Sequence, residues 1–333
     1  MTASRPQPHN TRHPAFADGQ QHRPLTLAAI SVVALFSSPL TLAYDLPVVN
    51  LGLTSFLDGG VPAGPGVYAQ AYYQHYSSNR LNNQHGDTLG LPKTDLDYQV
   101  LVAQLTWLST RRLGNGSLGI NTLVPLVTHM NVDDGLNNAA LSAQAGTGDL
   151  LVGPFIQFDP VMGANGPRFV QRIELQFNLP TGDYDANTSV NPGNNALSFN
   201  PYWAGTYWIT PQWTTSARLH YLYNSENNDP STAFGDVDSV QAGQALHANL
   251  AISRDMGQGW RLGLNGYALE QITDTQVDGK TVTGRRESVY AAGPGVMYSF
   301  SADNHVVVNG YREFAVENRP EGNRVQMRWI HHF

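Results

Sequence analysis

The chain of 333 residues has a formal net charge of −7, and only 14% of its residues are charged, against roughly 25% in ordinary globular domains. The acidic balance and the lack of a Lys/Arg-rich stripe exclude nucleic acid as an expected partner. The sequence has no cysteine, which excludes disulfides, thiolate metal sites and cysteine nucleophiles. So few charges suit a wall between lipid and water better than a soluble domain.

Residues 1–43 are predicted to be a cleaved signal peptide. Three arginines precede the apolar run Leu25–Leu42, and the small residue Ala43 offers a cleavage site. The alternative is a membrane anchor, but Pro39 interrupts the run and leaves it short of the about 20 residues that a spanning helix needs. Residues 44–66 are predicted to be irregular, and the sequence leaves open whether they lie in the periplasm or plug a barrel.

Beyond residue 66 the chain repeats segments of strand character separated by turns. In Phe169–Leu179, Ile173 and Leu175 share one face while Arg172 and Glu174 share the other, the period of a half-buried strand. Trp213–Asn224 and Trp260–Gln271 show the same alternation. The predicted strands are Val67–Ser77, Tyr98–Leu108, Leu118–Thr128, Asp149–Phe158, Phe169–Leu179, Ser198–Ile209, Trp213–Asn224, Gln241–Ser253, Trp260–Gln271, Ser288–Phe300, Val306–Phe314 and Val325–Phe333.

The connections alternate between long and short. The long ones are Ser78–Lys93, His129–Thr147, Pro180–Leu197, Ser225–Ser239 and Thr273–Arg286, the short ones are Arg111–Gly116, Asp159–Pro167, Thr210-Pro211, Arg254–Gly259 and Ser301–Asn304, and Ala315–Asn323 is intermediate. Outer-membrane barrels have long outer loops and short periplasmic turns. The pattern therefore predicts an all-β fold, a transmembrane antiparallel up-and-down barrel of about 12 strands over residues 67–333.

The C-terminal strand supports export to the outer membrane of a Gram-negative cell. Val325, Met327, Trp329 and His331 share a face, and the chain ends on Phe333, which resembles the assembly signal that outer-membrane barrels present to the barrel-assembly machinery. Both mature termini are then expected in the periplasm, with lipid and lipopolysaccharide as surroundings. Aromatic residues near strand ends suit interfacial girdles or ordinary strand positions. They are Tyr72, Tyr73, Trp107, Tyr202, Trp203, Trp208, Trp213, Trp260, Tyr298 and Trp329.

Four short phrases carry a family resemblance. They are Pro65-Gly66-Val67-Tyr68, Gly146-Thr147-Gly148-Asp149-Leu150, Leu179-Pro180-Thr181-Gly182-Asp183-Tyr184 and Ser198-Phe199-Asn200-Pro201-Tyr202. In this order they resemble the MetA-pathway of phenol degradation family, and the resemblance runs from about Pro65 to Phe333. It implies an outer-membrane barrel associated with the catabolism of aromatic or other hydrophobic compounds. It brings no catalytic residues to transfer.

If the apolar faces contact lipid, a set of polar side chains faces the lumen. The candidates are Arg172, Glu174, Gln176, Arg218, His220, His247, Asn249, Arg261, Asn265, Tyr267 and Gln271. Charges facing lipid cost a few kcal/mol at mid-bilayer, so Arg172 and Glu174 point inward. We expect such charges to pair and hold the wall together rather than to contact solute. The mixed signs argue against strong ion selectivity.

Enzymatic alternatives find little support. Ser216, His220, His247 and Asn249 can be grouped into a hydrolase-like set, but no Gly-x-Ser-x-Gly elbow, His-Glu-x-x-His or P-loop occurs. Asp183-x-Asp185-x-Asn187 begins like a calcium loop, but Thr188 replaces the glycine that such loops need at position six. We expect no enzyme activity, metal or cofactor.

The barrel pattern predicts a passive outer-membrane channel or transporter, and the family resemblance implies small, hydrophobic or aromatic solutes. Solute would diffuse through the lumen or through a lateral opening in the wall. An outer-membrane lipid or ester hydrolase and a closed structural barrel stay open as alternatives.

Overall fold

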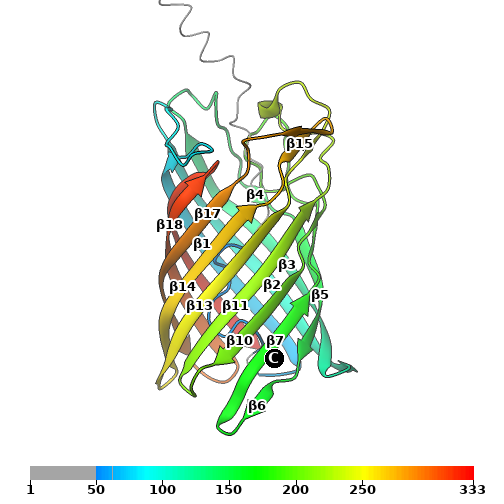
Figure 1. Cartoon of the computed structure of the whole chain (residues 1–333), viewed down its shortest axis with the longest axis vertical. Helices are drawn as coiled ribbons and strands as arrows, with labels where there is room; N and C mark the ends of the chain where they lie inside the picture. The colour runs from blue at the N-terminus through cyan, green and yellow to red at the C-terminus, as the bar shows by residue number, and fades with distance from the viewer. Residues whose placement is uncertain (1–49, 62) are drawn as a thin grey trace, which may run out of the picture. The chain divides into compact units, whose positions relative to one another are not determined.

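The computed structural model describes residues 50–61 and 63–333. These residues form a closed antiparallel β-barrel of twelve wall strands (Figure 1). The predicted signal peptide, residues 1–43, lies outside the described residues. No helix in the described ranges is long and apolar enough to cross a membrane.

The barrel wall runs strand after strand in chain order. Nine strands are continuous: β1 (Gly66–Leu81), β2 (Asp95–Leu113), β3 (Gly116–Asp133), β11 (Trp213–Asn224), β13 (Ala245–Gly257), β14 (Trp260–Gln271), β17 (Ser288–Ser299), β18 (Asn304–Glu317) and β19 (Pro320–His332). Three more are interrupted: β4 (Gly146–Thr147) with β5 (Leu150–Phe158), β7 (Gly166–Glu174) with β8 (Phe177–Leu179), and β9 (Ser198–Phe199) with β10 (Tyr202–Trp208). The fold class predicted from the alternation is confirmed.

Four short strands and one 3-10 turn lie outside the wall. β6 (Val161–Gly163) extends the turn before β7. β12 (Val240–Gln241), β15 (Thr275–Val277) and β16 (Lys280–Val282) form a separate three-stranded sheet. A single 3-10 turn, η1 (Thr232–Phe234), is the only helical element of the described chain. The small sheet joins two long loops to each other.

The first and last strands close the barrel. β1 pairs antiparallel with β19 from Tyr68 opposite His332 to Leu81 opposite Pro320, and it pairs with β2 on its other side. Because hydrocarbon offers no hydrogen-bond partners, a strand crossing it must pair along both edges. Closure at the β1–β19 seam meets this requirement.

Side chains alternate between the two faces of the wall. Large apolar side chains are exposed on the outside, including Leu101, Leu105, Ile120, Val124, Leu126, Ile173, Leu175, Leu219, Leu250, Leu262, Leu264, Val325 and Met327. The residues between them are polar and buried, such as Arg172, Glu174, Arg218 and Gln326. This apolar exterior and polar interior is the pattern of a transmembrane barrel.

Tryptophans gather on the outside near the short turns. Trp107, Trp213, Trp260 and Trp329 are exposed at strand positions close to that end, as expected for an interfacial girdle. Tyr72 and Tyr202, also considered for a girdle, are each only 3% exposed and face the lumen. The girdle interpretation is wrong for these two tyrosines, because they share the faces of Gln70 and Ala204, which point inward.

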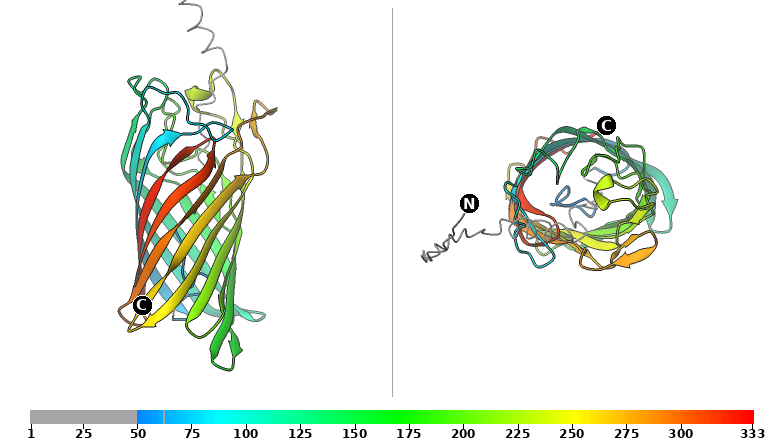
Figure 2. Two further views of the ribbon diagram at one scale, coloured as in Figure 1. Left: turned by 60° about the vertical axis from the view of Figure 1, so that its left-hand side comes forward. Right: turned by 90° about the horizontal axis from the view of Figure 1, so that it is seen from above.

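The connections differ strongly between the two ends of the barrel (Figure 2). Loops of residues 82–94, 134–145, 180–197, 225–244 and 272–287 gather at one end, whereas the turns after β2, β5, β10, β13 and β17 gather at the other. The eleventh connection is shorter than expected, since only Asn318 and Arg319 separate β18 from β19. Asn318 adopts a φ of 52° there, a conformation that lets the two strands extend to a tight turn.

Two prolines coincide with irregular places in the wall. One wall strand is interrupted at Leu175, between its parts β7 and β8, and another is interrupted at Pro201, between its parts β9 and β10. Backbone hydrogen bonds still cross these places: Leu175 N–H donates to Pro154 O at 3.0 Å, and Tyr221 N–H donates to Pro201 O at 3.1 Å. Backbone hydrogen bonds therefore bridge the wall at both irregular places.

The seam offers a matched pair of glycines for a stability test. A Cβ at Gly322 on β19 would overlap the Ser77 carbonyl and the Tyr76 ring, whereas a Cβ at Gly310 on β18 meets nothing within 4 Å. Overpacking of this kind costs about 1–3 kcal/mol. We therefore expect Gly322→Ala to lower the free energy of unfolding by that amount in urea titrations of the barrel in vesicles. Gly310→Ala should match the unsubstituted protein, and equal stability of the two variants would contradict this account of the seam.

Candidate functional site

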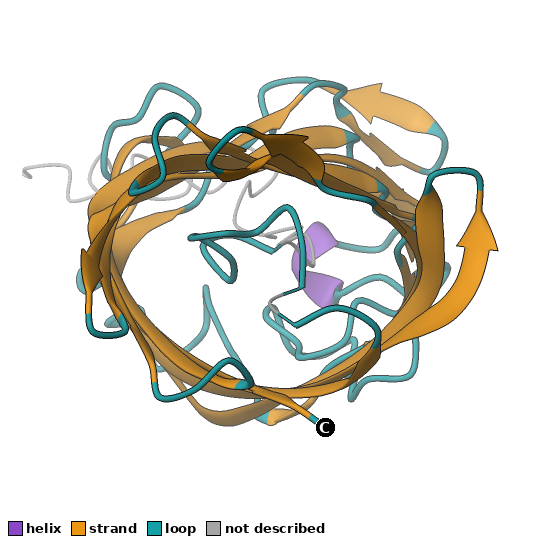
Figure 3. Cartoon of the chain, turned by 90° about the horizontal axis from the view of Figure 1, so that it is seen from below, coloured by secondary structure: helices purple, strands orange, loops and turns teal. Residues whose placement is uncertain are grey.

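Residues 50–61 lie inside the barrel and are called the plug below. Viewed along the axis, irregular backbone occupies part of the space enclosed by the strands (Figure 3). The plug is bound to the inner wall by hydrogen bonds with side chains on six strands, β5, β10, β11, β13, β18 and β19. It precedes β1 by only a few residues.

Wall side chains on several strands hold the plug backbone. Asn249 on β13 accepts a hydrogen bond from Gly52 N–H at 2.8 Å and donates to Asn50 O at 2.7 Å. Gln326 on β19 donates to Leu53 O at 2.8 Å. Because these groups are buried, each bond satisfies a backbone atom that would otherwise lose its partner.

Further bonds fix both ends of the plug. Arg324 donates to Leu51 O, and Gln157 donates to Gly59 O at 3.0 Å. The plug is thus bound to the wall at both its ends.

One buried ion pair joins the plug to the wall. Arg218 on β11 donates from Nε and Nη2 to the two carboxylate oxygens of Asp58 at 2.7 and 2.6 Å. Both side chains are at most 8% exposed. This bidentate geometry is the strongest arrangement open to a guanidinium and a carboxylate.

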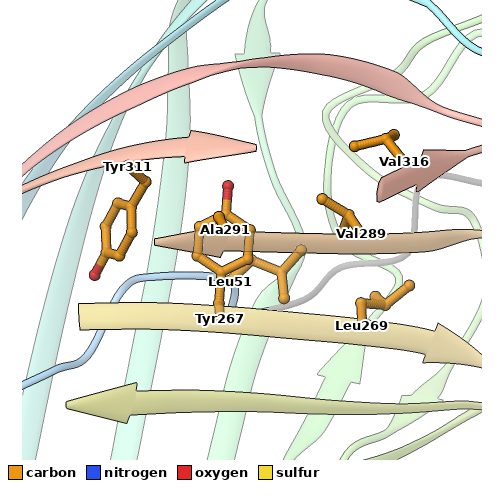
Figure 4. Packing of buried hydrophobic residues seen from close by; sticks show 7 residues of the cluster. All are labelled: Leu51, Tyr267, Leu269, Val289, Ala291, Tyr311 and Val316. Atoms are coloured by element: carbon orange, nitrogen blue, oxygen red, sulfur yellow. The ribbon is translucent and has the colours of Figure 1, made fainter. Parts of the chain in front are cut away.

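Two apolar side chains of the plug pack into the wall. Leu51 lies in a cluster with Tyr267, Leu269, Val289, Ala291, Tyr311 and Val316 from β14, β17 and β18 (Figure 4). Phe56 packs on Ala251, Met297 and Val307. Full burial of such a side chain contributes about 1.5–3 kcal/mol, so these two contacts stabilise the seated plug.

Two plug positions require glycine. Gly52 has a φ of +72° beside the rings of Tyr311 and Tyr267, a backbone conformation that side chains disfavour. A Cβ at Gly59 would overlap the backbone of Thr206 and Val170. The plug therefore approaches β7 and β10 backbone to backbone.

The plug lies between two cavities of the lumen. The one toward the long loops has a volume of about 270 Å³ and contacts the plug at Asn50, Leu51, Leu53 and Thr54. The other, toward the short turns, has a volume of about 570 Å³ and contacts it at Phe56, Leu57, Asp58, Gly60 and Val61. Four wall residues line both cavities: Gln70, Arg172, Arg218 and Arg328. These four side chains and the plug form the constriction of the lumen.

Arg172 and Glu174 face the lumen side of β7 but are not bound to each other. Arg172 donates from Nε to Gln157 Oε1 at 3.0 Å and stacks on the Phe155 ring. Glu174 accepts hydrogen bonds from Asn121, Tyr202 and Gln176 at 2.6–2.8 Å. Within the described ranges no ion pair within 4.0 Å joins the two charges, and neutral partners hydrogen-bond to each of them. Gln176, which was also predicted to face the lumen, is one of these neutral partners.

The two candidate histidines stack on each other. The rings of His220 on β11 and His247 on β13 lie 4.0 Å apart, and each is within 3.2 Å of Asn200 Oδ1. Ser216 shares its hydrogen bond with Thr206. The hydrolase-like set therefore lacks a contact between hydroxyl and imidazole, and its fourth member, Asn249, binds the plug.

The four candidates on β14 form hydrogen bonds with other residues of the barrel and of its loops. Arg261 donates to Thr214 at 3.0 Å and lies 3.5 Å from Asp255. Asn265 donates to Asn309 at 3.0 Å, Tyr267 donates to Glu313 at 2.7 Å, and Gln271 donates to Thr273 O at 3.0 Å. All but Gln271 are buried.

Several lumen residues on β1 and β19 are not among the candidates predicted from the sequence. They are Gln70, Tyr72, Gln74 and Tyr76 on β1, with Arg324, Gln326 and Arg328 on β19. The signal was present, because the outward face Val325, Met327, Trp329 places the intervening residues inward. Asp58 gave no comparable signal, since it lies in an irregular segment.

Potential metal ligands are dispersed. Among residues 50–61 and 63–333, no group of three or more His, Asp or Glu side chains is arranged to hold a metal ion. In the segment that begins like a calcium loop, Asp183 accepts a bond from Thr147 N–H at 2.7 Å and Asp185 accepts one from Asn187 N–H at 2.9 Å. Both carboxylates hold loop backbone.

A closed barrel with an apolar exterior, a polar lumen and a terminal plug defines a transmembrane β-barrel of the outer-membrane class. The chain belongs to the family described as "Putative MetA-pathway of phenol degradation", whose model matches residues 78–329. The family resemblance identified in the sequence is thereby confirmed.

The chain is similar to solved structures at low sequence identity. A COG4313 outer membrane channel from Pseudomonas putida F1 is 17% identical, with a TM-score of 0.72 over 84% of this chain and 99% of that one. The translocator domain of the autotransporter NalP from Neisseria meningitidis is 11% identical, with a TM-score of 0.48 over 92% of this chain and 98% of that one. No curated protein matches the sequence.

The Asp58–Arg218 pair predicts how firmly the plug stays seated. Removing one partner of a buried pair costs about 3 kcal/mol or more, and each 1.4 kcal/mol is a tenfold change in population. We expect Asp58→Asn to raise the frequency of open events at least about tenfold in planar-bilayer recordings. The matched control is Asp159→Asn, which breaks an exposed pair with Arg112 at a turn and should leave conductance unchanged. Equal recordings from both folded variants would rule out the ion pair as a fastening of the plug.

Proposed function

We propose that the protein is a passive outer-membrane channel for small hydrophobic or aromatic solutes, closed at rest by its own plug. The observation that carries this proposal is the pair of cavities that meet at one constriction. A purely structural barrel has no need of two such spaces separated by a removable segment. The family membership agrees with a role in the catabolism of aromatic compounds.

An apolar pocket at the long-loop end supports a hydrophobic solute. It is lined by Leu81, Leu96, Met130, Val132 and Leu141, among others. Tyr98, Met130 and Val190 line both this pocket and the cavity of about 270 Å³. A solute leaving the loops therefore meets apolar side chains before it reaches the constriction.

Passage requires the plug to move. Solute in the first cavity contacts Leu51 and Leu53 of the plug, and displacement of the plug joins the two cavities. The wall is hydrogen-bonded across its irregular places at Leu175 and Pro201, which supports the lumen as the proposed route in preference to a lateral opening.

Uptake measurements test the channel. Cells expressing the protein should take up a labelled monoaromatic solute faster than cells lacking it. Met130→Gln should reduce this initial rate about tenfold, because an amide in an apolar pocket loses hydration without a partner. Met162, exposed on β6, supplies the matched control Met162→Gln. If expression leaves uptake unchanged although the barrel is folded, the closed structural barrel becomes the better account.

We also propose that the long loops face the cell exterior and that both mature termini lie in the periplasm. The loop asymmetry between the two ends supports this orientation. Lipid, lipopolysaccharide and the barrel-assembly machinery are the proposed partners of the exposed belt and of the terminal strand.

Single cysteines read out the orientation, since the chain has none of its own. Lys280 lies exposed in a long loop, and Asn115 lies exposed in the turn between β2 and β3. In intact cells, a membrane-impermeant maleimide should label Lys280→Cys and leave Asn115→Cys unlabelled until the outer membrane is disrupted. The reverse pattern would invert the proposed orientation.

A further inference from the structure

We propose that the constriction binds small amphipathic carboxylates, with Arg328 holding the carboxylate, Arg172 adding positive charge to the same cavity, and the inner faces of β2 and β3 holding the apolar part. This inference rests on the proposed channel function and names the class of solute that its lumen selects. Among the hydrophobic or aromatic solutes of that proposal, it selects those that carry a carboxylate.

The charge of the first cavity is one-sided. Five arginines line it: Arg172, Arg218, Arg319, Arg324 and Arg328. Of the described residues that line this cavity, none is Asp or Glu. A space walled by cations favours anions, because little water separates the charges.

Three of the five guanidiniums have an acidic partner. Arg218 binds Asp58, Arg319 lies 3.3 Å from Glu287, and Arg324 lies 4.0 Å from Glu313. Arg172 and Arg328 have no carboxylate within 4.0 Å in the part of the chain that the structure describes. These two residues also line both cavities, so their charge is placed where a solute must pass.

Arg328 is poised to accept an anion. Its Nε and Nη2 both donate to the single oxygen Gln70 Oε1, at 2.9 and 2.6 Å, and no described residue accepts a hydrogen bond from Nη1. Gln70 thus fixes the plane of the guanidinium while part of its donor capacity remains unused. A carboxylate supplies the planar, paired oxygens that a guanidinium binds best.

Arg172 adds a second unbalanced charge. The residue is 6% exposed, and its Nη2 has no hydrogen-bond partner among the described residues. Glu174 lies two positions away but gives its oxygens to Asn121, Tyr202 and Gln176. Leaving a buried guanidinium donor without a hydrogen-bond partner is costly, and an anionic solute would offset that cost.

The arginines flank an apolar wall. Val100 and Val102 on β2, with Leu123, Pro125 and Val127 on β3, line the same cavity. In the wall order, β19 with Arg328 lies on one side of β1, β2 and β3, and β7 with Arg172 lies beyond β5 on the other. A molecule with a charged head and an apolar body can therefore contact both surfaces at once.

The plug itself shows which group the constriction binds. Asp58 places a carboxylate on Arg218 with two hydrogen bonds, beside the other two arginines that line both cavities. A carboxylate solute presents the same group to the same kind of partner. It therefore competes with the plug, and binding of cargo weakens the fastening that keeps the channel closed.

The size of the cavity limits the cargo. A volume of about 270 Å³ corresponds to roughly nine water molecules at about 30 Å³ each. This accommodates a single aromatic ring or a short alkyl chain with its carboxylate. We therefore choose benzoate as the probe and its neutral isostere benzamide as the comparison.

Calorimetric titration of the purified full-length barrel in detergent tests the site. We expect benzoate to bind at least about tenfold more tightly than benzamide, the discrimination of about one charge-assisted hydrogen bond. Arg328→Gln should weaken benzoate binding about 10- to 100-fold and leave benzamide unchanged, and Arg328→Lys should retain part of the affinity. Arg111→Gln, at an exposed position near the turn after β2, is the matched control and should bind benzoate as the unsubstituted protein does.

Asp58→Asn provides an arm that does not depend on removing an arginine. Without the competing carboxylate on Arg218, benzoate should bind more tightly, whereas benzamide binding should stay the same. Equal binding of benzoate and benzamide, or equal effects of Arg328→Gln and Arg111→Gln in folded barrels, would overturn the carboxylate site. In that case uptake of a neutral monoaromatic solute would still report on the channel, so failure of the site and failure of the channel are distinguishable.

Discussion

A polypeptide in hydrocarbon must satisfy every backbone hydrogen bond within the protein, and the rest of this molecule follows from that constraint. It forces the twelve strands to close at the β1–β19 seam, and the pleat then sends alternate side chains to opposite faces. Because the outer face in contact with hydrocarbon must be apolar, the polar side chains of the membrane-spanning parts of the strands are driven into a narrow interior. The crowded, hydrogen-bonded lumen is therefore a consequence of the membrane as much as of function.

Without the plug, several polar side chains of this crowded interior would lack hydrogen-bond partners. Asn249, Gln326 and Arg324 find their partners in its backbone, and Arg218 finds its partner in Asp58. Most of these are single hydrogen bonds, each worth about 0.5–1.5 kcal/mol net. A segment fastened in this way is ordered at rest and can still exchange its bonds for others.

Much of this architecture is readable in the sequence, and the reasons are physical. Strict alternation in Phe169–Leu179 identifies both faces of that strand, so the inward placement of Arg172 follows from the energetic cost of a charge facing lipid. Its partner does not follow, because pairing depends on the stagger between strands: Arg172 lies opposite Gln157 and Ala204. The position of the plug could not be predicted for a similar reason. An irregular segment has no period, and its position depends on contacts with residues far away in the chain.

The plug also bears on how the barrel comes together. It is continuous with β1 on one side of the seam. Its carbonyl oxygens at Leu51 and Leu53 accept hydrogen bonds from Arg324 and Gln326 on β19, each 273 positions away in the chain. Contacts of such long range form late, because the entropy of closing the intervening loop must first be overcome. The plug thus links the first and last strands from inside the barrel, and once these contacts form they stabilise the register of the β1–β19 seam.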